Sequence, residues 1–241
     1  MASLLSVLDT ERFGVRTAKT TISETRSVAE IFSDCGREQI RLLIARCDAL
    51  DQSSCDALQA RGAFLVDSLI SYRLDLATFS LNGEARVEIK QASPSDAERL
   101  KVVAEEGFAN YRGHYHNDIR LDRALCAGVY GDWIYRACLK NSGQQAILIA
   151  EDESRAALGF ALVEQTDSET GVGALYAVSP QARGQGVYQS LLSSSVRWCQ
   201  KRNLSQMIYK TQGTNFVAQT QVARIGFQPF KLEFTFHKWF D

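Results

Sequence analysis

The chain has 241 residues, with 27 Lys and Arg against 28 Asp and Glu and a formal net charge of −1. This length suits one large domain or two small ones, and an apolar content of 45% can form a substantial core and excludes wholesale disorder. The near-neutral balance gives no general attraction to nucleic acid or to an anionic membrane. No apolar run approaches roughly eighteen residues, so no membrane span is expected.

Six cysteines are scattered along the chain without a Cys-x-x-Cys pair. A small disulfide scaffold would be shorter and richer in cysteine, so we expect reduced thiols that pack in the interior. No cysteine lies near His114 or His116, and no metal site is expected. The opening segment from Met1 to Asp9 is apolar but short and has no basic start, so it is a poor signal peptide. These features favour a cytoplasmic protein.

The first part of the chain, residues 1–82, is expected to form a smaller α/β domain. Apolar patterning and capping residues predict a strand over 14–22, a short helix from Glu24, a strand over 40–45, a helix over 52–61 capped by Ser53 or Ser54 and stopped by Gly62, and a strand over 64–76. The polar, turn-rich segment 80–84 marks the boundary.

The second part, residues 83–241, is expected to be the catalytic α/β domain. The pattern predicts a strand over 87–90, a helix from the cap Ser95 to Ala109, a polar aromatic loop over 110–120, a helix over 121–139, strands over 146–150, 159–165 and 173–178, a helix over 186–202, a strand over 206–210, a helix over 215–225 and a last strand around 230–236. The order is therefore β-α-α-β-β-β-α-β-α-β.

The strongest chemical signal is a glycine-rich turn between a strand and an amphipathic helix, over residues 178–192. Gly184 and Gly186 allow a tight turn and a close approach to a ligand. The free N–H groups at the start of the helix suit a pyrophosphate, and Arg183 can add charge-assisted bonds. No Gly-Lys-Ser/Thr follows, so this is not a Walker loop, and the glycines are too few for a dinucleotide fingerprint. A loop that merely caps the helix is the alternative.

Val-Ser-Pro at 178–180 followed by Arg-Gly-x-Gly at 183–186 resembles the coenzyme A loop of the GNAT acetyltransferase superfamily. The segments 159–162 and 215–227 match in order, so the resemblance covers roughly residues 87–241. It implies a central mixed, mostly antiparallel sheet flanked by helices, with acetyl-CoA as cosubstrate and no metal. The implied coenzyme A residues are Val178, Arg183, Gly184, Gln185, Gly186, Val187, Tyr188 and Asn215. Tyr188 departs from the usual Gly or Ala, so its side chain must point away from the pantetheine.

Segments 8–15 and 57–66, followed by His-Tyr-His-Asn-Asp at 114–118 and by Tyr130 and Trp133, resemble in their order the TDP-fucosamine acetyltransferases and related nucleotide-aminosugar N-acetyltransferases. The resemblance implies acetylation of the 3- or 4-amino group of a nucleotide-linked, dTDP-type, aminodideoxy sugar for cell-surface polysaccharide biosynthesis. The residues themselves are compatible, because they offer donors and stacking faces to phosphates, hydroxyls and a base: Arg112, His114, Tyr115, His116, Asn117, Tyr130 and Trp133. A solvated loop, and core packing of Tyr130 and Trp133, are the alternatives.

Direct attack of an amine on the thioester needs a base for the amine proton and a fixed donor for the oxyanion. The resemblance points to the backbone N–H of Val178 as that donor. The family's tyrosine acid falls on Val222, so it cannot be carried over. The leaving thiolate would then be protonated by water or by another side chain that reaches it. The candidates are His114, Tyr115, His116, Glu164 and Tyr176. The candidate bases are His114 and His116, for their near-neutral pKa, and Glu164; His237 is expected to be structural or exposed.

Two other functions stay open. One is a GNAT acetyltransferase for a different amine, such as a polyamine, a peptide N-terminus or an antibiotic. The other is a non-catalytic acyl-CoA-binding module, which the missing tyrosine allows. The sequence also leaves open the nucleotide base, the stereochemistry of the sugar, and a homodimer.

Overall fold

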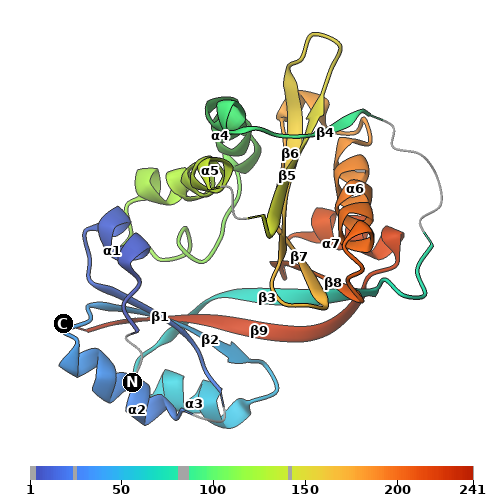
Figure 1. Ribbon diagram of the computed structural model, residues 1–241. Helices are drawn as coiled ribbons and strands as arrows, with labels where there is room; N and C mark the ends of the chain where they lie inside the picture. Colours follow the sequence, from blue (N-terminus) through green and yellow to red (C-terminus); the bar gives the residue numbers. More distant parts are fainter. Residues whose placement is uncertain (1–3, 24–25, 81–86, 141–142, 241) are drawn as a thin grey trace.

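The computed structural model describes residues 4–23, 26–80, 87–140 and 143–240. These residues form one nine-stranded sheet in the order β1-β2-β9-β3-β8-β7-β6-β5-β4 (Figure 1). The strands are β1 (Thr17–Thr21), β2 (Leu42–Asp48), β3 (Phe64–Asp75), β4 (Ile89–Gln91), β5 (Gln145–Glu151), β6 (Ala157–Gln165), β7 (Thr170–Val178), β8 (Gln206–Gln212) and β9 (Gln228–Trp239). Within the described sheet, β1–β2 and β7–β8 are the parallel pairs and the other pairs are antiparallel. The predicted mixed, mostly antiparallel sheet is therefore confirmed.

Helices cover both faces of the sheet. They are α1 (Val7–Phe13), α2 (Val28–Arg37), α3 (Gln52–Ala60), α4 (Ala97–Phe108), α5 (Arg123–Leu139), α6 (Val187–Lys201) and α7 (Phe216–Ile225). The apolar clusters place α2, α3, α6 and α7 on one face, and α1, α4 and α5 on the other (Figure 1). No helix in the described ranges is long and apolar enough to cross a membrane.

Two helix caps differ from the prediction. The cap of α3 is Asp51, whose side chain accepts the Ser54 N–H at 3.0 Å, and not Ser53 or Ser54. The Asp51 carboxylate satisfies a free amide at the helix start, and the helix begins at residue 52 as predicted. Before α4, Pro94 opens a 3-10 turn that is capped by Ser93, paired with Asp96, and α4 itself begins after Asp96 and not after a Ser95 cap. Helix α1 was not predicted.

The two parts of the chain exchange strands. The last strand, β9, lies between β2 and β3, and β3 pairs with β8 over seven residue pairs, from Leu69 with Gln212 to Asp75 with Gln206. The sheet is therefore continuous across the expected boundary between residues 82 and 83. That boundary falls among residues 81–86, outside the described residues, and stays a prediction.

The two parallel strands β7 and β8 separate halfway along their length. Their pairing runs from Thr170 with Gln206 to Gly173 with Tyr209 and stops there. Beyond this point β8 continues along β3, and β7 continues along β6 to Val178. The sheet therefore opens between β7 and β8 on the side where α6 begins.

Candidate active site

Glycine and a bulge create the opening between β7 and β8. Ala174 is the extra residue of a β-bulge in β7, just after the last pair with β8, and a bulge bends the strand that carries it. A Cβ on Gly173 would lie 2.9 Å from the ring of Tyr176 and 3.1 Å from that of Tyr209. Both rings therefore need a glycine here.

The backbone of β7 presents N–H groups to this opening. The Ser179 N–H donates to the Leu158 carbonyl at 2.9 Å, and Val178 lies opposite Gly159. Bonded and non-bonded positions alternate along an antiparallel pair, so the N–H groups of Val178 and Tyr176 point away from β6 and into the opening. Such a fixed donor can stabilise the oxyanion of an acyl-transfer intermediate. Tyr176 also lines the cleft described below and Val178 does not, so Tyr176 joins Val178 as a candidate.

The glycine-rich loop ends at the first turn of α6. Gly184 and Gly186 have φ of +78° and +82°, a conformation that favours glycine. The Ser190 N–H donates to the Gly186 carbonyl at 3.0 Å, so the preceding amides at the helix start are available to a ligand. A Cβ at Gly184 would meet no described atom within 4 Å. Arg183 donates to the Gly107 carbonyl at 3.1 Å, which holds it beside the loop. These features fit a pyrophosphate.

Tyr188 packs inside the molecule, as its place in the loop requires. Its hydroxyl lies 2.5 Å from the hydroxyl of Tyr209, and its ring centroid lies 5.7 Å from that of Tyr176. Val222 is fully buried in the same apolar cluster. Burial raises the pKa of Tyr209 to about 12. The position of the family's tyrosine acid therefore holds an aliphatic core residue.

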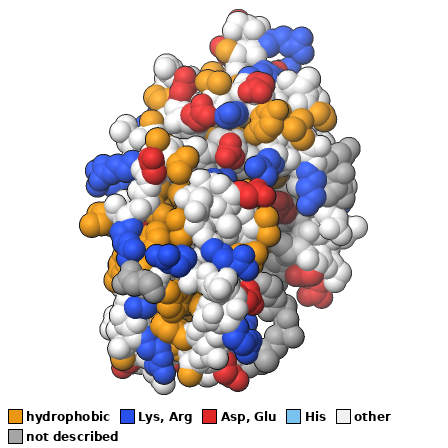
Figure 2. Space-filling view, turned by 90° about the vertical axis from the view of Figure 1, so that its left-hand side faces the viewer, with side chains coloured by type: hydrophobic (Ala, Val, Ile, Leu, Met, Phe, Trp, Pro, Cys, Tyr) orange, Lys and Arg blue, Asp and Glu red, His pale blue; other side chains and the backbone are white. Residues whose placement is uncertain are grey.

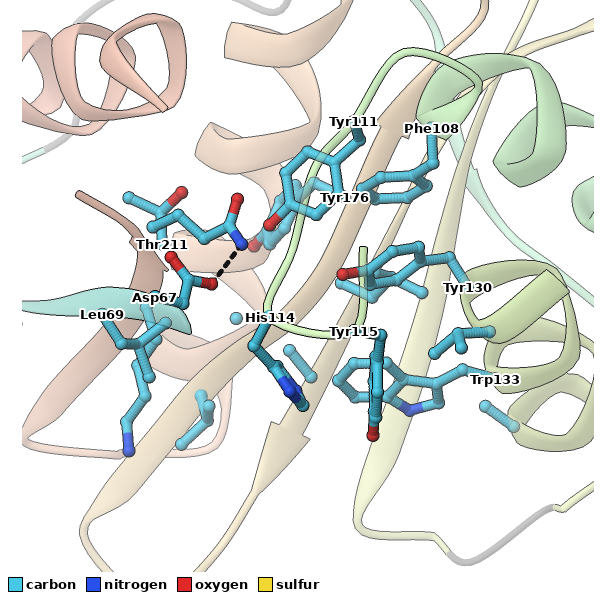
Figure 3. Close-up of a pocket in the computed structure, with 18 of the residues that line it drawn as sticks. Asp67, Leu69, Phe108, Tyr111, His114, Tyr115, Tyr130, Trp133, Tyr176 and Thr211 are labelled. Carbon is cyan, nitrogen blue, oxygen red and sulfur yellow. Dashed lines mark hydrogen bonds between the residues drawn. The ribbon is translucent and has the colours of Figure 1, made fainter. Parts of the chain in front are cut away.

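A cleft of about 710 Å³ lies on the face of the sheet covered by α1, α4 and α5. Figure 3 shows the aromatic side chains of Phe108, Tyr111, Tyr115, Tyr130 and Trp133 along one side of this cleft, with Asp67, Leu69 and Thr211 opposite. The Phe108 and Tyr130 rings stack with centroids 4.2 Å apart, and the Trp133 side chain is 40% exposed. Flat apolar faces with few polar groups are typical of small-molecule sites.

The charges that line the cleft are mostly positive. Six basic residues (Arg12, Lys19, Arg46, Arg136, Lys140 and Lys210) face three acidic ones (Asp9, Asp67 and Glu164). The Nε of Arg46 is buried and has no hydrogen-bond partner among the described residues. Figure 2 shows Lys and Arg side chains beside hydrophobic side chains across the middle of the face that lies on the left of Figure 1. A chain with a net charge of −1 thus concentrates positive charge where a substrate would bind.

The structure brings some of the predicted site residues to the cleft and leaves others away from it. His114, Tyr115, Tyr130, Trp133, Glu164, Tyr176 and Asn215 line it. The remaining candidates are not among its lining residues: Arg112, His116, Asn117, Val178, the loop residues 183–188, and Val222. Asn215 also caps α7 by accepting the Ala218 N–H at 3.1 Å.

Three residues of the 110–120 loop hold the loop in place. Tyr115 donates to Asp9 at 2.8 Å and accepts from Lys19 at 3.2 Å, so the loop docks on the first part of the chain. Asn117 donates to the Val66 carbonyl at 2.7 Å. His116 Nδ1 accepts the Gly113 N–H at 3.3 Å. Their predicted role in substrate binding stays a prediction.

His237 is fully buried, so the expectation that it is exposed is wrong, and its structural role stays a prediction. Its Nδ1 lies 2.7 Å from Asp118 Oδ2, and its Nε2 lies 3.1 Å from Nδ1 of His114. Asp118 Oδ2 also accepts from Trp239 Nε1 at 2.9 Å. A buried chain of hydrogen bonds therefore ends at the histidine that lines the cleft.

Asp67 is a cleft residue that the sequence analysis missed. A bulge at Val66 turns it toward Gln212, whose amide donates to Oδ2, and the Ser68 N–H donates to Oδ1 at 2.8 Å (Figure 3). Burial raises the pKa of Asp67, although the hydrogen bonds from Gln212 and Ser68 act to lower it. Charged residues inside the apolar runs 40–47 and 64–76, among them Arg46 and Asp67, were the available signal, because a charge in a buried strand needs a partner or a cavity.

Comparisons with known proteins agree with this geometry. Residues 112–227, a little under half of the chain, match the model of the acetyltransferase (GNAT) family. No curated protein matches the chain by sequence.

Solved structures extend the similarity of fold to nearly the whole chain. A conserved protein of unknown function from Staphylococcus epidermidis is 14% identical with a TM-score of 0.65, over 99% of this chain and 92% of that one. A tandem GNAT protein of the clavulanic acid biosynthesis pathway is 14% identical with a TM-score of 0.64, over 94% and 76%. A GCN5-related N-acetyltransferase from Kribbella flavida is 10% identical with a TM-score of 0.60, over 92% and 81%. At these identities the likeness concerns the fold. In the described residues no group of three or more His, Cys, Asp or Glu side chains could hold a metal ion.

Proposed function

We propose that the protein is an acetyl-CoA-dependent N-acetyltransferase that acetylates the 3- or 4-amino group of a nucleotide-linked aminodideoxy sugar, of the dTDP type, for cell-surface polysaccharide biosynthesis. The observation that carries the proposal is that two features lie next to each other. The opening between β7 and β8, beside the glycine-rich loop, meets a cleft whose lining has six basic and three acidic side chains.

The opening and the loop support the acetyl-CoA half of the proposal. The amides before Ser190 and the Arg183 side chain would hold the pyrophosphate, and the Tyr176 or Val178 N–H would hold the carbonyl oxygen that becomes the oxyanion. The amine attacks the thioester carbon directly in a ternary complex, and the coenzyme A thiolate leaves. Orientation of the two substrates in one cleft can contribute several kcal/mol to this step.

The charge and the aromatic rings of the cleft support a nucleotide-linked acceptor. Arg46 offers an unpartnered buried Nε to a phosphate, and Lys210, Arg136 and Lys140 add positive charge along the lining. Trp133 and the stacked Phe108–Tyr130 pair offer faces for a base. A polyamine would be repelled by this lining, which favours an anionic acceptor over one of the alternative amines.

The compartment and the assembly are part of the proposal. All six cysteines are free and buried, which supports a reducing compartment such as the cytoplasm. The homodimer stays a prediction.

A transfer assay tests the proposal. Release of coenzyme A thiol would be followed with dTDP- and UDP-linked 3- or 4-amino-dideoxy sugars, a polyamine and a peptide with a free N-terminus, and mass spectrometry would identify the product. We expect turnover with the nucleotide sugars and strong competition by dTDP or UDP. Turnover with the polyamine or peptide alone would favour the alternative acceptor, and binding of acetyl-CoA without turnover on any amine would favour an acyl-CoA-binding module.

A further inference from the structure

We infer that Asp118 and His237 position His114 so that its Nε2 serves as the proton acceptor for the substrate amine. This inference rests on the proposed acetyl transfer and adds to it the identity of the base and of two positioning residues. The three side chains come from the 110–120 loop and from β9, the exchanged strand. His114 lines the cleft, while Asp118 and His237 lie behind it and do not.

The direction of each hydrogen bond in the series follows from Asp118, which stands at its buried end. Although burial opposes its ionisation, hydrogen bonds from His237 and Trp239 hold the pKa of Asp118 below its usual value. A carboxylate only accepts, so the Nδ1 of His237, at 2.7 Å, carries a hydrogen. The Nε2 of a neutral His237 is then an acceptor. His114 Nδ1 lies 3.1 Å from that atom and must therefore donate to it.

This order leaves His114 with a free electron pair on Nε2, the atom not used by His237. His114 is 8% exposed and His237 is fully buried, so solvent and substrate reach this series of hydrogen-bonded side chains at His114. The ring of His114 is fixed further by Tyr115, whose centroid lies 3.8 Å away. A histidine held in one tautomer and one orientation is the arrangement that general-base catalysis needs.

The surroundings keep this histidine neutral. It is faced by Lys19 from β1, Arg46 from β2, His237 from β9, Asp67 from β3, and Tyr115 and His116 from its own loop. Burial is the main cause that holds the pKa of His114 well below its usual value, and the cations Lys19 and Arg46 add to it. The base form is thus present across the neutral range.

The step balances as follows. As the amine nitrogen bonds to the thioester carbon, His114 Nε2 takes one proton from that nitrogen. The resulting positive charge is stabilised through His237 by the Asp118 carboxylate. The carbon–sulfur bond then breaks and the thiolate leaves, and His114 returns its proton to the thiolate or to solvent.

Nitrogen NMR tests the order of hydrogen bonds without any substrate. The chain has three histidines, so a protein labelled with ¹⁵N-histidine gives few signals, which His→Gln variants assign. We expect a protonated Nδ1 and a non-protonated Nε2 for both His114 and His237 at neutral pH. A protonated Nε2 on His114 would make it a donor to the substrate and would overturn the inference.

Kinetics tests the role of His114, His237 and Asp118 in the reaction, with a dTDP-linked 4-amino-dideoxy sugar as acceptor. His114→Ala should lower kcat/KM by about 10²–10⁴-fold, with acetyl-CoA affinity unchanged and the acidic limb of the pH–rate profile removed. His237→Gln and Asp118→Asn should lower kcat more than they raise KM and should shift that limb. Asp34→Asn is the matched control, because Asp34 is also a buried carboxylate with basic partners, Arg26 and Arg37, but lies on α2. We expect the control to keep the parent profile.

The outcomes separate the inference from the proposed function. Folded His114→Ala protein with the parent rate and profile would overturn the inference while acetyl transfer stands. The expected tautomers together with turnover on another amine only would overturn the proposed substrate, and the same variants would then be measured with that amine. A loss of rate in Asp118→Asn that is matched by Asp34→Asn would indicate general destabilisation and would count against a positioning role.

Discussion

Replacement of Gly186 by aspartate acts on the backbone and the charge of the coenzyme A loop together. Gly186 has φ of +82° and directly precedes α6. A residue with a Cβ in the left-handed conformation costs roughly 1–2 kcal/mol. This part of the effect acts on the loop whether or not a ligand is bound, so it should lower the stability of the fold.

The new carboxylate adds a term that acts on binding alone. Two unit charges about 4 Å apart repel by roughly 1 kcal/mol in bulk water and about 4 kcal/mol near a protein surface. The aspartate would stand beside the amides that are proposed to hold the pyrophosphate. We therefore expect the affinity for acetyl-CoA to fall at least about tenfold, which corresponds to about 1.4 kcal/mol.

Isothermal titration calorimetry with acetyl-CoA measures this effect, and circular dichroism verifies that the variant is folded. The matched control is Gly62→Asp, since Gly62 also has a left-handed backbone, with φ of +77°, and follows α3 in the first part of the chain. The control undergoes the same change of charge and a similar backbone cost, and should bind acetyl-CoA within about twofold of the parent. Folded Gly186→Asp protein with parent affinity would refute the placement of the pyrophosphate.

Three further changes test the cleft and its framework. Arg46→Met should weaken dTDP binding by at least about tenfold, because a hydrogen bond to a charged group contributes roughly 1.5–3 kcal/mol; unchanged affinity in calorimetry would remove Arg46 from the acceptor site. Gly173→Ala should lower both the melting temperature and acetyl-CoA affinity, because the new methyl group would lie 2.9 Å from the Tyr176 ring; parent values for both would contradict this account. Asp118→Asn should reduce the loss of stability in acid. The folded state holds the pKa of Asp118 below its usual 3.8, so its carboxylate stabilises the fold above that pH and ceases to as the pH falls through the lowered value. Urea unfolding at a series of pH values measures this, and an unchanged acid slope would count against it.

Apart from α1, the order of the helices and strands was predictable, because these elements have local signals. The period of two around 230–236 indicated β9, and the glycines before 187 indicated where α6 begins. The pairing of β9 with β2, and of β3 with β8, has no such signal. Both pairings are antiparallel contacts between residues far apart in the sequence, and strand neighbours at that separation are decided by the packing of the whole sheet.

The site was predictable to the extent that its chemistry is local. Gly184 and Gly186 permit a left-handed turn, and the structure gives both a positive φ. His114 was a candidate because histidine titrates near neutral pH. Its partner was not evident, because His237 is 123 residues away, and His237 is 119 residues from Asp118. Arg46 and Asp67 were missed for the same reason, since strand exchange brings them to a cleft that neither part of the chain forms alone.

The absence of an acid at Val222 makes the base end of the site decisive for the rate. Tyr209 lines the cleft, and burial raises the pKa of its hydroxyl to about 12. The leaving coenzyme A thiolate, whose thiol form has a pKa near about 8.5, would take a proton from that hydroxyl only uphill, so it leaves without help from a tyrosine acid. The amine, in contrast, must lose a proton, because a protonated amine cannot attack the thioester. A buried Asp118–His237–His114 chain supplies a neutral acceptor on that side. The rate should therefore fall at acidic pH, where His114 becomes protonated. It should show no fall at alkaline pH that comes from a tyrosine.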